Sequence, residues 1–329
     1  MPVSEAVVIG GGIAGITAAL DLANHGIHVH LIEREPTIGG HMAMLDKTFP
    51  TNDCSMCILS PKMVDTARHP KISLHTCTEV TGIEGSEGNF TVKVTKHPRY
   101  IREEDCTGCG DCVTICPVEV YNRFDAGLGV RKAIYKSHPQ VVPNVVIRDV
   151  EHCINCGLCY DICGKDCILR DHEDGAEEAV IQASVVVIAT GYEVFDAKLK
   201  PAFKFMQIPD VITSMEFERM INASGPTQGT LKRLSTGEKP KTIVFVQCVG
   251  SRDCQLGNES CSAVCCMYAT KNALLIKEKY PEIDVIVLYM DLRAYGKGYE
   301  EFYNRAERVG SALFADCPEM CMIQNNLSA

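Results

Sequence analysis

The sequence lacks the features that direct a chain to a membrane, to nucleic acid or out of the cell. No apolar run approaches the roughly 20 residues that a membrane-spanning helix needs. The net charge of -10 at pH 7 argues against nucleic acid as a partner. An apolar strand begins within a few residues of Met1, which leaves no room for a signal or transit peptide. We therefore expect a cytoplasmic chain that does not cross a membrane.

Cysteine, by contrast, is abundant, with 19 in the 329 residues. Eight of them form two runs of C-x2-C-x2-C-x3-C, the spacing by which bacterial ferredoxins hold 4Fe-4S clusters. There the fourth cysteine of each run binds the other run's cluster, so the spacing predicts crossed ligation. Gly110 and Gly157 stand where each loop turns around the sulfides, which suits a residue with positive φ. The predicted sets are Cys106, Cys109, Cys112 with Cys163, and Cys153, Cys156, Cys159 with Cys116.

Zinc and disulfides are the alternatives for these cysteines. A zinc site would use two C-x2-C pairs and leave the remaining cysteines idle, so two four-cysteine runs fit clusters better. Thiolate-held clusters also favour a reducing compartment, in agreement with the cytoplasm. Two details depart from a ferredoxin: Gly164 rather than proline follows Cys163, and the linker between the runs is long. The pattern indicates a segment that moves electrons one at a time.

The N-terminal residues have the pattern of a dinucleotide-binding β-α-β unit. A strand over residues 6–9 leads into Gly10-Gly11-Gly12-Ile13-Ala14-Gly15. A helix over residues 13–24 and a second strand over residues 27–32 follow, and Glu33 ends that strand. Strand, glycines, helix, strand and terminal acid in this register predict a bound dinucleotide. A glycine-rich turn without a ligand is the alternative.

Each position of this pattern has a physical task. Gly10 makes the turn, Gly12 lets the backbone approach a pyrophosphate, and Gly15 lets the helix pack on the strand. The helix N-terminus faces the phosphates with free amides and a partial positive charge. Glu33 accepts hydrogen bonds from the ribose hydroxyls and would repel a 2′-phosphate.

Two further features favour FAD over NAD. Gly39-Gly40 lies past Glu33, and a second buried apolar strand over residues 183–189 ends at Thr190-Gly191. Both resemble flavoproteins of the glutathione and thioredoxin reductase type, where the double glycine lies near the pyrophosphate and flavin. That resemblance also implies a backbone contact to the adenine at Val80. The predicted FAD-binding residues are Gly10, Gly12, Ile13, Ala14, Gly15, Glu33, Arg34, Gly39, Gly40, Val80, Thr190 and Gly191.

The predicted fold class is α/β, with a thioredoxin-reductase-like flavin domain of Rossmann type, an inserted ferredoxin domain and a second Rossmann-like unit. An insertion whose ends lie close together is tolerated in a surface connection. In the second unit, strands over 241–247 and 284–289 flank a helix over 262–278, and a short helix over 214–221 precedes them. The predicted boundaries are 1–96 and 180–236 for the split flavin domain, 97–179 for the insertion, 237–310 for the second unit and 311–329 for the tail.

The second β-α-β unit carries cysteines in place of the glycine fingerprint. Cys248 follows its first strand, Cys254 comes next, and Cys261, Cys265 and Cys266 open the helix. A helix N-terminus lowers thiol pKa and so favours thiolate ligands. Packing is the alternative for any one of these cysteines. Their density predicts a third cluster and no nicotinamide.

Three features together resemble the A-type subunit of heterodisulfide reductase, a flavin and iron–sulfur protein of methanogenic archaea and related organisms. They are the flavin fingerprint with Thr51-Asn52-Asp53-Cys54-Ser55-Met56-Cys57, the inserted ferredoxin, and Cys261-Ser262-Ala263-Val264-Cys265-Cys266-Met267 with Lys271. The resemblance spans about residues 4–308. It implies that Cys248, Cys261, Cys265 and Cys266 bind the additional cluster, with Cys254 as a reserve ligand. It also implies that Lys271 lies near the flavin, where its charge favours the reduced, anionic form.

The same resemblance implies an oxidoreductase component of a cytosolic complex. Such a protein takes two electrons at FAD and passes one toward ferredoxin and one toward the coenzyme M–coenzyme B heterodisulfide, which is reduced on another subunit. The implied partners are the other reductase subunits, ferredoxin, and an electron-donating hydrogenase or formate dehydrogenase module. The alternatives are a noncatalytic electron-transfer module and a quinone-linked oxidoreductase subunit.

The sequence departs from that family near its end. The family closes its flavin domain with a later strand and a Gly-Asp-like turn, whereas residues from Gly310 to Ala329 show no clear strand signal. We expect that a separate chain supplies the missing part or that the gene product is incomplete. Cys54 and Cys57 form a C-x2-C that fits a redox dithiol or cluster ligands equally. Cys77 is predicted to pack a strand, and the roles of Cys167, Cys317 and Cys321 stay open.

Overall fold

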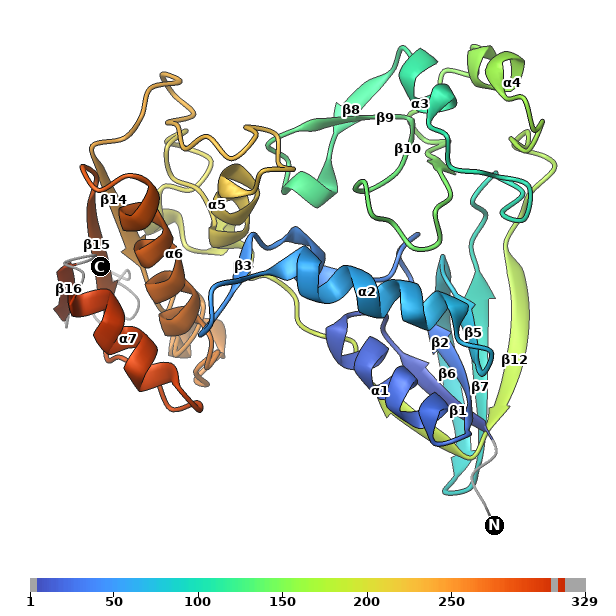
Figure 1. The fold of residues 1–329 in the computed structure, drawn as a ribbon, viewed down its shortest axis with the longest axis horizontal. Coiled ribbons are helices and arrows are strands. Elements are labelled where there is room, and N and C mark those ends of the chain that lie inside the picture. Colours follow the sequence, from blue (N-terminus) through green and yellow to red (C-terminus); the bar gives the residue numbers. More distant parts are fainter. Residues whose placement is uncertain (1–4, 309–312, 317–329) are drawn as a thin grey trace. The chain divides into compact units, whose positions relative to one another are not determined.

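The computed structural model describes residues 5–308 and 313–316 of the chain. The chain divides into two compact units, each with its own parallel sheet (Figure 1). The first comprises Met1–Leu45 and Ser55–Tyr192, and the second Asp46–Cys54 and Glu193–Ala329. Residues 193–236, assigned from the sequence to the flavin domain, thus group with the second unit.

The first unit is built on a four-stranded parallel sheet. Its strands are, in spatial order, β13 (Val185–Ile188), β1 (Glu5–Ile9), β2 (His28–Ile32) and β5 (Ile72–His75). Near-continuous apolar runs form such strands because both faces of a parallel sheet are covered. Val8 of β1 pairs with Leu31 on one side and with Val187 on the other. The strand from beyond the insertion therefore completes the nucleotide-type sheet.

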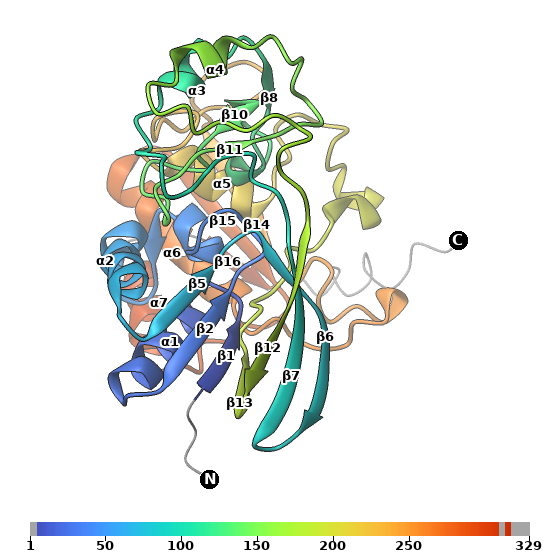
Figure 2. The same ribbon diagram turned by 90° about the vertical axis from the view of Figure 1, so that its right-hand side faces the viewer.

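Helices cover one face of this sheet and an antiparallel meander covers the other (Figures 1 and 2). On the helical face, Ile16 and Leu59 pack with Val8. On the opposite face, Val92 packs with Val7. The helices are α1 (Ile13–Asn24) and α2 (Ser55–Arg68), and the meander strands are β6 (Thr78–Ser86), β7 (Asn89–Lys96) and β12 (Glu177–Ala183).

The predicted strand over residues 183–189 is wrong in one respect, because it joins parts of two strands. β12 ends at Ala183 in the meander, and β13 begins at Val185 in the parallel sheet. Ser184 lies between them and donates its N–H to the carbonyl of Glu5 at 2.9 Å. A continuous apolar run cannot show where a chain passes from one sheet to another.

The insertion leaves and rejoins the first unit at neighbouring points. Lys96 at the end of β7 pairs with Glu177 at the start of β12, so the ends of the insertion lie side by side. Its core contains Ile101, Ile134, Val146 and Ile168. Its elements are α3 (Asp111–Ile115), α4 (Leu158–Ile162), the pair β8 (Glu119–Tyr121) and β9 (Val130–Lys132), the pair β10 (Ile134–Tyr135) and β11 (Ile147–Arg148), and the 3-10 helix η2 (Arg123–Asp125).

The second unit contains another parallel sheet, formed in the order β14 (Thr242–Val246), β15 (Asp284–Tyr289) and β16 (Leu313–Asp316). Two helices, α6 (Cys265–Lys279) and α7 (Tyr299–Arg308), pack Met267 and Leu274 against Phe302. The helix α5 (Ser214–Ile221) has the predicted bounds and begins with a Thr213–Glu216 capping box. The remaining elements are β3 (Lys47–Thr48), β4 (Asp53–Cys54) and the 3-10 helices η1 (Gly40–Met44, in the first unit), η3 (Ala197–Leu199), η4 (Pro201–Phe203) and η5 (Cys254–Leu256).

Two sequence predictions for the second unit are wrong. The tail carries the strand β16, whose Leu313 pairs with Ile286 of β15, although the sequence predicts no strand there. A four-residue strand depends on pairing with its neighbour more than on its own sequence. The helix α6 begins at Cys265 rather than at residue 262, so Cys261 lies in the loop before it.

Candidate functional site

The glycine turn after β1 has the geometry that a dinucleotide requires. Gly10 has φ of +104°, a conformation that side chains rarely adopt, and a Cβ there would lie 2.3 Å from the carbonyl oxygen of Ala189. Gly15 lies so close to Gly10 that a Cβ would fall 1.8 Å from the Gly10 carbonyl oxygen. Gly10 therefore makes the turn, and Gly15 lets α1 pack on it, as predicted.

Gly12 differs from both of these glycines. It caps the N-terminus of α1 with an ordinary φ of -73°, and a Cβ there would meet nothing within 4 Å. Because a glycine cap has no side chain to bond the first helical N–H groups, these donors and the open space fit an incoming phosphate. Ile13 and Ala14 form the first turn of this helix, and Ala14 is exposed.

Glu33 lies at the end of β2, beside the glycine turn. Its carboxylate accepts hydrogen bonds from the N–H groups of Gly11 at 2.7 Å and Glu35 at 2.9 Å. Burial raises the pKa of Glu33, and the two N–H donors oppose that rise. Each carboxylate oxygen retains a second lone pair. The residue thus stands where the ribose acceptor was predicted, and it also fixes the turn.

The other predicted nucleotide-binding residues fall into two groups. Gly39 forms a bridge to Gly12, and a Cβ on Gly40 would lie 3.0 Å from the Gly12 Cα atom. The backbone of Thr190 lies 3.1 Å from the Cβ position of Gly10, and Gly191 follows it. Arg34 is exposed and forms a 3.9 Å ion pair with Glu35. Val80 packs in the core between the sheet and the meander, in one cluster with Ile9 and Ile32.

The two cysteine runs fold into matching loops. Gly110 with φ of +89° and Gly157 with φ of +84° cap α3 and α4. The prediction of positive φ at these two glycines is confirmed. Gly108 and Asn155, at equivalent places in the runs, also have positive φ. A repeated sequence pattern has therefore produced a repeated backbone.

One cavity gathers cysteines from both runs. It is a small pocket, open in part to solvent, and is lined by Cys153, Cys156 and Cys159 together with Cys116 of the first run. These are the four thiols of the second predicted ligand set. The donor set fits a cluster, since thiolates are the ligands that iron–sulfur centres use.

The other ligand set is brought together as well. Cys112 is buried, which raises its pKa to about 12, and the neighbours that act on it include Cys106, Cys109 and Cys163. Cys163 comes from the second run, and so does Cys159, which also acts on Cys112 and is predicted to belong to the other set. The buried Cys167 places its sulfur 3.6 Å from that of Cys163 and also contacts Cys106. Cys167 has no predicted role because it stands outside both runs.

A third group of thiols lies in the second unit, where β14 ends and α6 begins. Cys265 is hydrogen-bonded to both Cys248 and Cys266, and Cys261 lies close enough to act on Cys248. The bonds from Cys248 and Cys266 lower the pKa of Cys265, while the pKa values of those two donors rise. The four thiols that the family resemblance selected are thus adjacent, and their donor set fits an iron–sulfur cluster.

Cys254 stands apart from this group. It begins η5 and is exposed. The loop between Cys248 and Cys265 folds on itself: Ser251 Oγ donates to the carbonyl of Ser260 at 2.9 Å and accepts from the N–H of Ser262 at 2.9 Å. These bonds return the chain to the start of α6 and so bring Cys261 near Cys248.

Lys271 is buried in the second unit, on α6, with 1% of its side chain exposed. Its ammonium forms an ion pair with Glu218 of α5 and donates to the carbonyl of Lys47 at 3.0 Å. Glu218 in turn accepts from the N–H of Asp46 at 3.1 Å. The pair therefore fixes the segment 46–54 to α6, a role that the sequence did not indicate.

The remaining cysteines differ in whether they form a disulfide and in how far they are buried. Cys54 and Cys57 are disulfide-bonded, whereas the other cysteines that the structure describes are free. Cys77 is buried at 3% exposure beside the meander, as expected of a packing residue. Cys317 and Cys321 lie outside the described residues.

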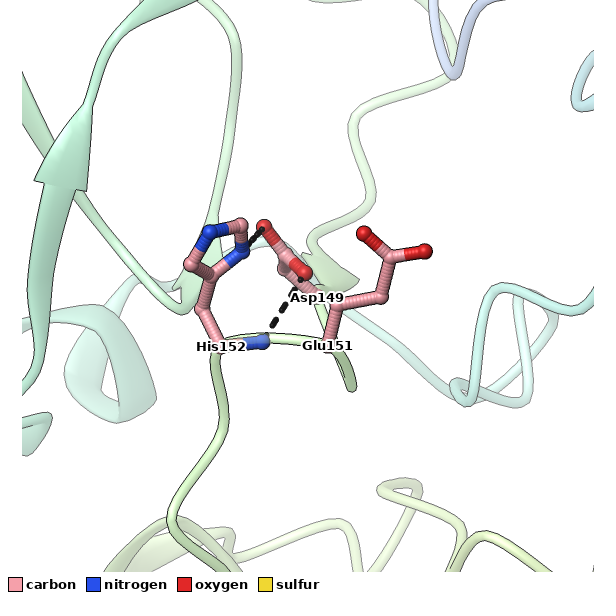
Figure 3. Close-up of side chains that lie close together, drawn as sticks. All are labelled: Asp149, Glu151 and His152. Carbon is pink, nitrogen blue, oxygen red and sulfur yellow. Dashed lines mark hydrogen bonds and ion pairs between the residues drawn. The ribbon is translucent and has the colours of Figure 1, made fainter.

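Three further side chains in the insertion, Asp149, Glu151 and His152, lie close enough together to be considered as metal ligands (Figure 3). The Asp149 carboxylate is already paired with Arg131 at 2.7 Å and with the His152 ring at 3.0 Å. The bonds to Arg131 and His152 outweigh burial and lower the pKa of Asp149. These contacts form a local ion-pair network, and we assign no metal site to these residues.

Comparisons with known proteins agree with this arrangement. Residues 8–57 match the family model described as NAD(P)-binding Rossmann-like domain, and residues 90–168 match that of the 4Fe-4S dicluster domain. No helix among the residues with a described structure is long and apolar enough to cross a bilayer. A dinucleotide-binding α/β unit joined to a dicluster domain defines the class: an iron–sulfur protein with a Rossmann-type unit.

Relatives from methanogenic archaea narrow this class. The second A-type iron–sulfur subunit of CoB–CoM heterodisulfide reductase from Methanopyrus kandleri is 56% identical over 304 residues, 92% of this chain and 46% of that protein. The A-type subunit of the H(2):CoB-CoM heterodisulfide,ferredoxin reductase from Methanothermobacter marburgensis is 52% identical over 303 residues, again 92% and 46%. The corresponding iron–sulfur subunit from Methanocaldococcus jannaschii is 50% identical over 319 residues, 97% and 48%.

Over this span, the chain is a homologue of the A-type subunit of heterodisulfide reductase, and the predicted resemblance is confirmed. Those relatives are named as subunits of heterodisulfide reductases. The chain spans about half the length of the curated relatives that it matches. The structure of Lactococcus lactis thioredoxin reductase aligns with a TM-score of 0.46 at 12% identity, covering 95% of this chain and 64% of that one.

Proposed function

We propose that the protein is the FAD and iron–sulfur subunit of a heterodisulfide reductase complex. The observation that carries this proposal is the assembly of three cysteine groups and a glycine turn in a chain homologous to the A-type subunit of that enzyme. FAD exchanges electrons in pairs and also singly, whereas clusters carry one at a time. Together they would let the protein receive two electrons and divide them.

The residues of the glycine turn would hold FAD. Gly12 and the uncapped N–H groups of Ile13 and Ala14 would bind the pyrophosphate, with Gly39 and Gly40 against it. Glu33 would accept from the ribose, since its carboxylate already lies at the turn. The remaining proposed contacts are Gly10, Gly15, Arg34, Val80, Thr190 and Gly191.

The cysteines would hold three 4Fe-4S clusters. Two would lie in the insertion with crossed ligation, one on Cys106, Cys109, Cys112 and Cys163 and one on Cys153, Cys156, Cys159 and Cys116. The third would bind Cys248, Cys261, Cys265 and Cys266 in the second unit. Lys271 lies on the helix that begins with the last two, and its positive charge would favour the reduced flavin.

The proposed setting is a cytoplasmic hetero-oligomer. Its other subunits would reduce the heterodisulfide, and the electron split between that route and ferredoxin would constitute flavin-based bifurcation. The relative from Methanothermobacter is named for hydrogen and ferredoxin, and that from Methanococcus maripaludis for hydrogen or formate. These names favour a hydrogenase or formate dehydrogenase module as the electron donor.

Crossed ligation is tested by replacing Cys163 with serine in the anaerobically purified full chain. We expect loss of the cluster on Cys106, Cys109 and Cys112, with the Cys153 cluster retained, as read by iron content and EPR spectroscopy. The matched control is Cys167→Ser, a buried thiol 3.6 Å from Cys163, which should retain both clusters. Loss of the Cys153 cluster alone on replacing Cys163 would refute crossed ligation. If the purified wild-type chain contained the clusters but no flavin, the alternative of a noncatalytic one-electron carrier would replace the proposed function.

A further inference from the structure

A buried arginine contacts one of the two cysteine runs. Arg148, at the end of β11, has 1% of its side chain exposed. Its Nε and Nη2 atoms both lie 3.4 Å from the Sγ atom of Cys153, each as a hydrogen-bond donor. This is the forked edge of a guanidinium, the edge that binds anions in two-pronged fashion. Here it points at a proposed cluster ligand.

All five donors of this guanidinium are used. Besides the two bonds to sulfur, Nη2 donates to Asn155 Oδ1, and Nη1 donates to Asp171 Oδ1 at 2.6 Å and to the carbonyl of Leu169 at 3.2 Å. The Tyr160 ring lies 5.6 Å from the guanidinium carbon. These contacts hold the Arg148 side chain in one orientation, with its Nε and Nη2 atoms directed at the sulfur of Cys153.

The charge of Arg148 is only partly cancelled. Its ion-pair partner Asp171 is 51% exposed, so water screens the carboxylate more than it screens the buried cation. The buried guanidinium therefore keeps part of its positive charge beside the sulfur of Cys153.

The first run has no equivalent contact. Within the described part of the chain, no lysine or arginine side chain donates to the sulfur of Cys106, Cys109, Cys112 or Cys163. Two cations lie near this set, but both donate to oxygen. Arg102 donates to Asp105 Oδ2 at 3.1 Å and to the carbonyl of Asp166, and Lys136 donates to the carbonyl of Gly108 at 2.9 Å. The added neighbour there is Cys167, a neutral thiol when protonated. The two runs match in backbone, but among the described residues only the second has a guanidinium bonded to a ligand sulfur.

Hydrogen bonds to cluster sulfurs and positive charge nearby both raise the reduction potential of an iron–sulfur cluster, because the reduced cluster carries one more negative charge. We propose that Arg148 makes the cluster on Cys153, Cys156, Cys159 and Cys116 the more easily reduced of the two in the insertion. This inference rests on the proposed function, which supplies the clusters. Arg148 is a positioning residue that acts through Cys153.

A potential difference gives the insertion a direction. An electron shared between the two clusters would reside mostly on the Cys153 cluster. We therefore expect electrons to leave the insertion from the Cys153 cluster toward an acceptor. Ile154, on the loop around it, and Leu158, the first residue of α4, are exposed.

The test is an EPR-monitored redox titration of the anaerobically purified full chain and of Arg148→Gln. We expect the variant to lower the midpoint of the Cys153 cluster so that its oxidised-to-reduced ratio rises about tenfold at fixed potential, a shift of about 59 mV for one electron. The midpoint of the Cys106 cluster should not move. The EPR signals are assigned with Cys163→Ser, in which the Cys153 cluster should be the only cluster left in the insertion. Arg148→Lys should shift the midpoint less, since it keeps the charge and loses the fork.

A second variant keeps the test decisive if Arg148→Gln fails to hold its cluster. Asp171→Asn removes the counter-charge at a half-exposed position, and we expect it to raise the midpoint of the Cys153 cluster. Equal midpoints in wild type and both variants, with full iron content, would overturn the inference and leave the proposed function standing. A wild-type chain with fewer than two clusters in the insertion would overturn the proposed function itself.

Discussion

The chain contains two β-α-β units that use the same position in opposite ways. In the first, β1 passes to α1 through three glycines, and the turn exposes backbone N–H groups at a helix N-terminus. In the second, residues 247–264 separate β14 from α6, and this loop brings four thiols to the same place. The carboxyl end of a parallel strand is where such folds bind ligands. We propose that the short turn suits a dinucleotide and the long loop suits a cluster.

The two helices also bury different surfaces. α1 buries the apolar residues Ile16, Ala19 and Ala23, whereas α6 buries Thr270, Lys271 and Asn272 among its apolar residues. A short turn fixes α1 so closely that apolar packing suffices to hold it. α6 has a long loop before it, and a buried ion pair to α5 fixes its position. Polar anchoring thus accompanies the longer connection.

The strongest test of this comparison removes a thiol from the second unit. Cys265→Ser should abolish the third cluster, because Cys265 contacts both Cys248 and Cys266. Iron content should fall by one cluster while the EPR signals of the insertion persist. Cys254→Ser, at an exposed position outside the group, is the matched control and should keep all clusters. If the four thiols of the second unit bind no metal in the wild-type chain, the two units do not differ in the ligand that they bind.

The ion pair of α6 should have the next largest effect. Lys271→Met leaves the buried Glu218 carboxylate without its partner, which costs about 3–5 kcal/mol of stability. Thermal unfolding followed by circular dichroism measures the loss. The double variant Lys271→Met with Glu218→Leu removes both charges and should recover most of it. If the single variant is as stable as wild type, α6 is held by apolar packing as α1 is.

Two glycines of the first unit separate packing from binding. Gly15→Ala should destabilise the chain by about 1–3 kcal/mol, because its Cβ would fall 1.8 Å from the Gly10 carbonyl oxygen. Gly12→Ala meets no protein atom within 4 Å and should leave unfolding unchanged. It should nonetheless weaken FAD retention, since the methyl occupies the space proposed for the pyrophosphate. Equal flavin content in Gly12→Ala and wild type would contradict that placement.

The smallest expected effect is a loss of stability of the first unit in acid. Burial, and then the charge of His30, lower the pKa of His75 to about 4, from an ordinary value near 6.5. Between these values the unfolded chain binds a proton that the folded chain refuses, so stability is lost as pH falls from about 6.5 to about 4. His75→Gln should reduce this slope in circular dichroism melts. The chain has no histidine after His172, so no histidine of the second unit contributes to it.

Much of this could be read from the sequence, because its strongest signals are local. The glycine turn, α1, α5, β15 and the loops at Gly110 and Gly157 follow from spacing along a continuous segment. Arg148 could not be found that way, since its contact with Cys153 depends on how β11 and the second cysteine loop fold together. The Lys271–Glu218 pair joins residues 53 positions apart for the same reason. The strand β16 was missed because its pairing, and not its composition, makes it a strand.

The two cysteine helices, α3 and α4, have five residues each, well below the length at which a helix is stable in water by itself. If each cluster joins one run to the other, the clusters act as covalent cross-links between these short helices. We expect the insertion to reach its final shape only when iron and sulfide are delivered, so that a newly made chain waits for its cofactors in a form open to proteases. The cell's iron supply would then set how much of the protein survives, and not only how much of it is active.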